Sequence, residues 1–233
     1  RPSALMQTHH LCVTQASLMP SGVPCSAIAV LVGNALLRTP ASASAIEHCI
    51  RLGCSTWAML TAPERGDKVP DAMLVAAQVL EDVVDAKTRI APWTHELEIS
   101  GLHLVAGTLV PAEMAQFLRA TSVTAPGTLE FATVDSLPAA LAMVATRSDA
   151  SGRSLAVTIT YAGHTIVVVY VRDHYGVVMH AVDSLRGEWL VADETSADAL
   201  VARVTTAWCV PTANAADASF TANVFSRRAA GQN

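Results

Sequence analysis

The sequence predicts an α+β fold in which an N-terminal helical part packs against an antiparallel sheet. Helix signals dominate the first third of the chain. Four strand-like segments then follow one another between residues 155 and 192, joined by short turns. Helices followed by a run of antiparallel strands are typical of the α+β class, and the two layers are expected to meet at a cleft.

The helical part begins after an irregular opening segment. Cys25 to Arg38 is predicted as a buried apolar helix, and Pro40 ends it. The sequence Ser44-Ala45-Ile46-Glu47 has the pattern of a capping box, which predicts a second helix running toward Leu60.

The remaining elements alternate before the sheet begins. They are a turn at Pro63–Asp67, helices at Pro70–Lys87 and Pro111–Ala120, strands at His95–Val105 and Thr128–Val134, and a helix opened by Ser136 with Pro138 that reaches Thr146. An antiparallel meander follows, with strands at Leu155–Tyr161, His164–Val171, Gly176–Asp183 and Trp189–Ala192, and a last helix at Ser196–Trp208.

We expect residues 1–209 to form one domain and residues 210–233 to form a flexible C-terminal tail. The end of the chain is polar, rich in Ala and Asn, and shows little periodic pattern. The chain starts with Arg1 rather than Met, which favours a monomeric domain of a larger protein.

Composition argues against several classes of partner and cofactor. The net charge is −5 and the basic residues are scattered, which disfavours a nucleic-acid partner. The apolar run Ile166–Val171 is far shorter than the roughly 20 residues that span a bilayer, so we expect no membrane partner. His9, His10 and Cys12 lack the partners of a metal site, and no glycine-rich nucleotide motif occurs, so we expect no metal or cofactor.

Cysteine usage points to one candidate nucleophile. Five cysteines form an odd set without framework spacing, which favours free thiols in an intracellular, reducing compartment. Cys49 and Cys54 fall inside an apolar helix and are interpreted as core residues, while Cys12 and Cys209 lack a loop-to-helix setting.

Cys25 differs because a Gly/Pro loop brings it to the first turn of a helix. The positive end of the helix dipole and its unpaired N–H groups favour a thiolate and can hold an oxyanion. The alternative is a buried core cysteine, since cysteine is among the most buried residue types.

His164 and Asp183 are predicted to face one another across a hairpin. If Asp173 and His174 form a two-residue loop, His164 lies directly opposite Asp183, and a four-residue loop moves the partner to the next position on the same face. Either register lets the carboxylate orient an imidazole that takes the cysteine proton. We expect this imidazole and the Cys25 sulfur to meet in a water-accessible crevice.

Each of these roles has a competitor. His180 is also close to Asp183 in sequence, but strand alternation points it to the opposite face. Asp183 is also suited to forming an Asx turn with the residues that follow it, and this role is compatible with orienting a histidine. Gln15 precedes the cysteine and is the candidate oxyanion donor, together with the Cys25 N–H. Gln7 is a less attractive substitute.

The order of these residues resembles that of papain-like cysteine peptidases. The finer match is to the deubiquitinase domain of herpesvirus large tegument proteins, through Gln15, the helix start Gly22–Ala29 and the segment Val182–Gly187. That family has an Asp-x-His pattern, whose histidine falls at Leu185 in this chain. His164 on the preceding strand is the replacement that the chain offers.

The resemblance implies a papain-like fold and a ubiquitin partner. It further implies thiol-dependent hydrolysis of ubiquitin or ubiquitin-like isopeptide bonds by a triad of Cys25, His164 and Asp183, assisted by Gln15, without a cofactor. Two alternatives stay open. One is a transglutaminase or another acyltransferase, which shares the order Cys, His, Asp. The other is an inactive ubiquitin-binding module, which the leucine at position 185 motivates.

Overall fold

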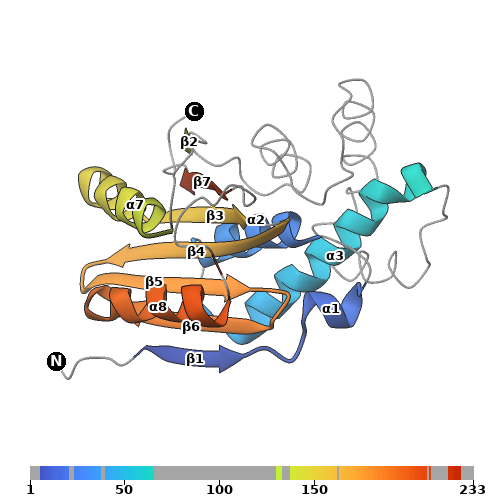
Figure 1. Cartoon of the computed structure of the whole chain (residues 1–233), viewed down its shortest axis with the longest axis horizontal. Coiled ribbons are helices and arrows are strands. Elements are labelled where there is room, and N and C mark those ends of the chain that lie inside the picture. Colours follow the sequence, from blue (N-terminus) through green and yellow to red (C-terminus); the bar gives the residue numbers. More distant parts are fainter. Residues whose placement is uncertain are drawn as a thin grey trace.

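A seven-stranded antiparallel sheet, of order β1-β6-β5-β4-β3-β7-β2, forms the centre of the molecule (Figure 1). The computed structural model describes residues 6–20, 24–37, 40–65, 130–132, 137–161, 163–208, 210 and 220–226. The helices predicted at 70–87 and 111–120 and the strand predicted at 95–105 lie outside these residues. The combination of this sheet with N-terminal helices confirms the α+β class.

The meander occupies the predicted segments with small changes at the ends. The strands are β1 (Gln7–His10), β2 (Glu130–Ala132), β3 (Leu155–Tyr161), β4 (His164–Asp173), β5 (Gly176–Asp183), β6 (Glu188–Asp193) and β7 (Phe220–Ser226). The helices are α1 (Gln15–Leu18), α2 (Cys25–Leu36), α3 (Ala43–Arg65), α7 (Leu137–Ser151) and α8 (Ala197–Ala207), with a 3-10 turn η3 (Glu194–Ser196) before α8.

Both faces of the sheet are covered, which explains why its central strands are apolar at nearly every position. On β4, Val167 and Val169 belong to the core shared with α2 and α3. The intervening Val168 belongs to the core shared with α7 and α8. Figure 1 shows the helices on the two sides of the strands. The sheet therefore fixes α2 against the start of β4.

The opening segment is more ordered than the sequence predicts. β1 pairs with β6 at the edge of the sheet, and Thr14 caps α1 in a reciprocal capping box with Ser17. Short elements of this kind carry little periodic signal, because pairing and capping stabilise them rather than a long apolar face.

Two predicted boundaries of α3 are wrong. The cap is Ser42 rather than Ser44, since the Ser42 hydroxyl accepts from the N–H of Ala45 at 3.2 Å. At its other end α3 continues through Pro63 to Arg65, where the sequence predicts a turn. A proline removes one helical hydrogen bond, and here the helix ends shortly after it.

The prediction of a flexible tail is wrong for Phe220–Ser226. This segment forms β7, which pairs with β3 on one side and β2 on the other. Ala222 and Val224 are buried, so the strand has a two-residue apolar period that the polar flanks conceal. The pairing also removes a free edge from β3.

None of the helices in the described ranges is both long enough and apolar enough to cross a bilayer.

Candidate active site

Cys25 begins α2, as the sequence predicts, but its side chain is only 1% exposed. The expectation of a water-accessible sulfur is wrong for this structure. The helix is apolar on almost every side, so packing between α3 and the sheet draws its first turn inward as well. The N-cap residue Pro24 makes no side-chain hydrogen bond to the helix, and the positive end of the helix dipole lies near Cys25.

His164 and Asp183 come together at the opposite end of β4 from the hairpin loop. The Nε2 atom of His164 lies 3.0 Å from Oδ1 of Asp183. The strand register pairs Asp173 with Gly176, so the loop is formed by residues 174 and 175, one position later than the predicted loop. Because of this change in register, His164 lies diagonally across from Asp183 rather than directly opposite it. The two side chains still lie on the same face of the sheet.

Asp183 forms an Asx turn at the same time. Its Oδ1 atom accepts hydrogen bonds from the backbone N–H groups of Leu185 at 2.9 Å and Arg186 at 3.2 Å, and its side chain is fully buried. The guanidinium of Arg186 lies 3.5 Å from the other carboxylate oxygen. The carboxylate is therefore held by its own turn while it contacts the histidine.

The pKa values of Cys25 and His164 move toward an ion pair. Burial opposes the charged form of each group, but their mutual hydrogen bond and charge outweigh it, together with Asp183 on the histidine side and Thr165 on the cysteine side. The pKa of the Cys25 thiol is lowered, and the pKa of His164 rises to about 9. Both shifts favour a thiolate beside an imidazolium.

Cys49 and Cys54 lie in α3 and contrast with Cys25. Both side chains are buried, and burial raises the pKa of each thiol to about 12. Without a charged partner they remain thiols at neutral pH, as expected for core cysteines. Cys12 is exposed, and Cys209 lies outside the described residues.

His180 points to the other face of β5, as strand alternation predicts. Its Nδ1 atom accepts a hydrogen bond from the Trp189 indole at 3.2 Å, and burial, together with the charge of His9, lowers the pKa of His180 to about 4. Trp189 also stacks on the His9 ring, with centroids 4.5 Å apart. We infer a packing role for His180, which joins β5, β6 and β1.

Gln15 begins α1 and is buried beside the turn that follows Asp183. Its backbone N–H donates to the Ser184 carbonyl at 2.8 Å, and its Oε1 atom accepts from the Ser184 hydroxyl at 3.1 Å. The amide oxygen of Gln15 is therefore held by the turn that follows Asp183. Gln7, the weaker alternative, lies on the edge strand β1 and is exposed.

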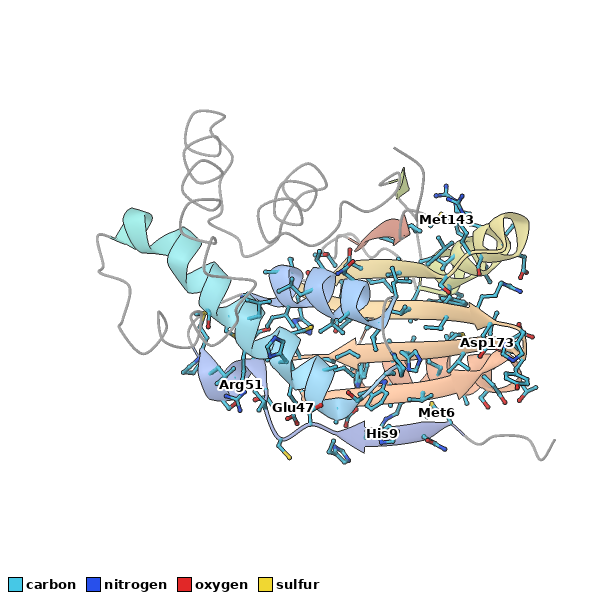
Figure 2. All side chains as sticks on the ribbon, turned by 180° about the vertical axis from the view of Figure 1, so that it is seen from behind. Met6, His9, Glu47, Arg51, Met143 and Asp173 are labelled. Atoms are coloured by element: carbon cyan, nitrogen blue, oxygen red, sulfur yellow. The ribbon has the colours of Figure 1, made fainter. Side chains whose placement is uncertain are left out.

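Hydrogen bonds also hold the residues that precede Gln15 in the chain. The backbone N–H of Cys12 donates to the Glu47 carboxylate at 2.6 Å, and the N–H of Leu11 donates to the Gly187 carbonyl at 2.8 Å. Figure 2 shows Glu47 on α3 above the strand that carries His9. Glu47 thus binds this segment, whereas the sequence pattern assigns it to a capping box.

Sequence reasoning missed Ser184, Glu47 and Thr165. Each is an ordinary polar residue in a turn, a helix or a strand, and only the assembled fold gives it a partner across a large separation in sequence. Ser184 lies in the segment Val182–Gly187 that carries the tegument resemblance, and this is the sequence signal that points to its neighbourhood.

Comparison with known proteins identifies the fold. The structure is similar to the crystal structure of the ubiquitin-specific protease encoded by murine cytomegalovirus tegument protein M48, in complex with a ubiquitin-based suicide substrate. The TM-score is 0.53, over 97% of this chain and 90% of that chain. The fold is that of a papain-like tegument protease. The sequences are 11% identical, and neither a family model nor a curated protein matches this sequence.

We predict that replacing Gly187 by alanine loosens the segment that carries Gln15. Gly187 has φ +67°, and a Cβ atom there would lie 2.6 Å from Cγ2 of Thr14. Strain and clash together should lower the free energy of unfolding by about 1–3 kcal/mol. Gly152→Ala is the control, because Gly152 has φ +64° but open space around it. Urea unfolding of both variants measures the difference, and equal losses would contradict the role of the Thr14 contact.

Asp183→Asn should separate the orienting role from the turn role. The amide oxygen still accepts the two turn hydrogen bonds, but the charge that raises the pKa of His164 to about 9 is gone. We expect a loss in kcat/KM on the order of 10²-fold or more. The rate of a reaction that uses a thiolate beside an imidazolium rises with pH through the thiol pKa and falls above the histidine pKa. The upper limit should therefore move below that of the unmodified protein.

A pH–rate profile of Asp183→Asn beside Asp183→Ala provides the test. Alanine removes the turn acceptor as well, so it should lose stability in addition to rate. An unchanged upper limit in the asparagine variant would show that Asp183 does not act on His164.

Proposed function

We propose that this chain is a cysteine peptidase that hydrolyses the isopeptide bond between ubiquitin, or a ubiquitin-like modifier, and a lysine side chain. The observation that carries the proposal is the His164 ring, bound at 3.0 Å by buried Asp183, together with the pKa of Cys25 at the start of α2, which His164 lowers. The likeness to the fold of a ubiquitin-specific protease supports the choice of substrate.

The geometry suggests a two-stage reaction. His164 takes the thiol proton, and the Cys25 sulfur attacks the carbonyl carbon of the modifier's C-terminal glycine. The tetrahedral intermediate collapses, the C–N bond breaks, and the lysine amine leaves with the proton from His164. Water then adds to the thioester with His164 as base, which releases the free carboxylate and restores the thiol.

The supporting residues have separate tasks in this scheme. Asp183 keeps the imidazole in one orientation and stabilises its charged form. The amide nitrogen of Gln15 and the N–H of Cys25 hold the oxyanion, and one such donor is worth about 3 kcal/mol in acyl-transfer enzymes.

The burial of the site favours a slender substrate. Cys25 is 1% exposed and the His164 side chain 17% exposed, so a substrate reaches the sulfur most readily past the histidine. A Gly-Gly tail, which has no side chains, fits such an approach better than a bulky peptide, and glycine lets two backbones lie close together.

An electrophilic probe tests the proposal. Ubiquitin with a reactive group at its C-terminus should form a one-to-one adduct, and peptide mapping should place that adduct on Cys25. Probes made from other modifiers, run in parallel, establish which modifier is preferred. Binding of ubiquitin without an adduct or hydrolysis would overturn the proposal in favour of a binding module. Transfer of an acyl group to an added amine in preference to water would favour an acyltransferase.

A further inference from the structure

The two oxygen atoms of the Asp183 carboxylate have unequal surroundings. Oδ1 accepts hydrogen bonds from the His164 ring at 3.0 Å and from the backbone N–H groups of Leu185 at 2.9 Å and Arg186 at 3.2 Å. Oδ2 is buried and has no hydrogen-bond partner among the described residues. A buried carboxylate oxygen without a donor is costly unless a nearby charge compensates it.

Arg186 is the residue that brings such a charge to Oδ2. Its Nε atom lies 3.5 Å from Oδ2, and its backbone N–H donates to Oδ1, so one residue faces both oxygens. The Arg186 side chain is 44% exposed, whereas the Asp183 side chain is fully buried. The guanidinium therefore contacts the buried carboxylate and solvent at the same time.

The turn that carries Arg186 is held by backbone hydrogen bonds. The N–H of Gly187 donates to the Asp183 carbonyl at 2.9 Å, and the Ser184 carbonyl accepts from the N–H of Gln15 at 2.8 Å. Because this backbone is fixed, the Arg186 side chain starts from a defined position beside the carboxylate.

We propose that Arg186 is a positioning residue whose guanidinium supplies the countercharge for Oδ2 of Asp183, and so limits how strongly that carboxylate holds the proton of His164. A cation beside a carboxylate offsets part of the attraction that the carboxylate exerts on a neighbouring imidazolium. The catalytic meaning rests on the proposed function, in which His164 first holds a proton and then gives it to the leaving amine. An uncompensated carboxylate would favour the first step over the second.

The other titratable groups that face His164 are Cys25 of α2 and Tyr161 of β3. Cys25 raises the pKa of His164, as Asp183 does. The Tyr161 ring meets the imidazole edge-on, with centroids 5.8 Å apart, and its hydroxyl donates to the Trp208 carbonyl at 3.0 Å. Neither group supplies a positive charge, so a change at Arg186 isolates the countercharge.

Titration of the His164 ring by NMR tests the proposal without any substrate. Histidine labelled with ¹³C in the ring provides the resonances, and His164→Ala identifies the one from His164. Loss of a nearby cation favours the imidazolium, so the pKa of His164 should rise above its value of about 9 in Arg186→Gln. We expect a rise of about half a pH unit, the size typical of one partly exposed charge. Arg186→Lys keeps the charge and should leave the pKa close to its original value.

Arg172→Gln is the matched control. Arg172 lies near the other end of β4 from His164 and pairs with Asp149, so its loss makes the same change in net charge away from the site. An unchanged pKa of His164 in Arg186→Gln would overturn the proposal. A fall would also overturn it, because Arg186 would then only hold the turn. An equal rise in Arg172→Gln or Arg186→Lys would show that the countercharge is not the cause.

A double variant decides the question if Arg186→Gln does not fold. With Asp183→Asn in the same chain, the carboxylate charge that Arg186 compensates is absent. The double variant should then fold, and its urea unfolding should lie close to that of Asp183→Asn alone. A double variant that also fails to fold, while Asp183→Asn folds, would overturn the proposal.

The outcome for the proposed function is separate. A raised pKa of His164 in Arg186→Gln, combined with no ubiquitin hydrolysis by the unmodified protein, would support the role of Arg186 and reject the deubiquitinase. Hydrolysis by the unmodified protein with an unchanged pKa in Arg186→Gln would do the reverse.

Discussion

Cys25→Ala is expected to abolish hydrolysis of a fluorogenic ubiquitin substrate while leaving thermal unfolding nearly unchanged. Loss of the nucleophile should reduce kcat/KM by about 10⁴-fold or more, because the thioester forms on this sulfur. Stability should change little, since the variant removes a small side chain and His164 keeps its hydrogen bond to Asp183. Removing one member of a buried ion pair is costly when the other charge is left unpaired, and here His164 stays paired with Asp183.

Cys49→Ala is expected to have the opposite effects, with activity kept and stability reduced. Cys49 is buried in α3, and burial raises the pKa of its thiol to about 12, so it is not a competing nucleophile. We expect full activity with a loss of about 1 kcal/mol in the free energy of unfolding, as for removal of a small buried group. Measuring rate and melting temperature for both variants separates the roles of the two cysteines. Activity that survives Cys25→Ala, or disappears in Cys49→Ala, would refute the assignment.

The hairpin shows why part of the site was predictable. Side chains alternate along a strand, so a shift of pairing by two residues leaves the same residues on the same face. The observed hairpin loop lies one residue later than the predicted loop, yet His164 Nε2 and Asp183 Oδ1 still lie 3.0 Å apart. Apolar alternation and a tight turn were sufficient for this contact, even though the register was not known.

Leu185 stands where the tegument pattern has its histidine. The β4–β5 pairing ends at Val167 and Val182, and Leu185 lies in the turn that follows β5. Leu185 is 45% exposed, and its N–H is bound to Asp183. In this chain the Asp183 carboxylate contacts the backbone of Leu185 and the imidazole of His164 on β4.

The hydrogen bonds that hold the residues around the site could not be predicted in the same way. Gln15 depends on Ser184, and Cys12 depends on Glu47, through contacts that join segments far apart in sequence. No periodicity encodes these pairs. The burial of Cys25 was missed for a related reason, since a loop-to-helix pattern locates a residue on a helix but does not show what packs over it.

His164→Ala is the second variant for which a very large effect is expected. It removes the group that takes the thiol proton, and it removes the hydrogen bond and charge that lower the pKa of Cys25. Both losses act on the same step, so kcat/KM should fall by about 10³-fold or more. The pKa of Cys25 should rise in parallel, because burial then acts without its main opposing interaction. The pH midpoint for alkylation of Cys25 by iodoacetamide measures this rise.

His180→Ala is the control on the neighbouring strand. His180 accepts from the Trp189 indole, and its loss leaves a buried N–H unpaired, which costs about 1–3 kcal/mol of stability. Its side chain lies on the other face of β5 from Asp183, so most of the rate should remain. An inactive His180→Ala beside an active His164→Ala would show that the base is His180, on the face of β5 opposite Asp183. Such a result would require a different partner for Cys25, because the Nε2–Oδ1 contact would then be structural only.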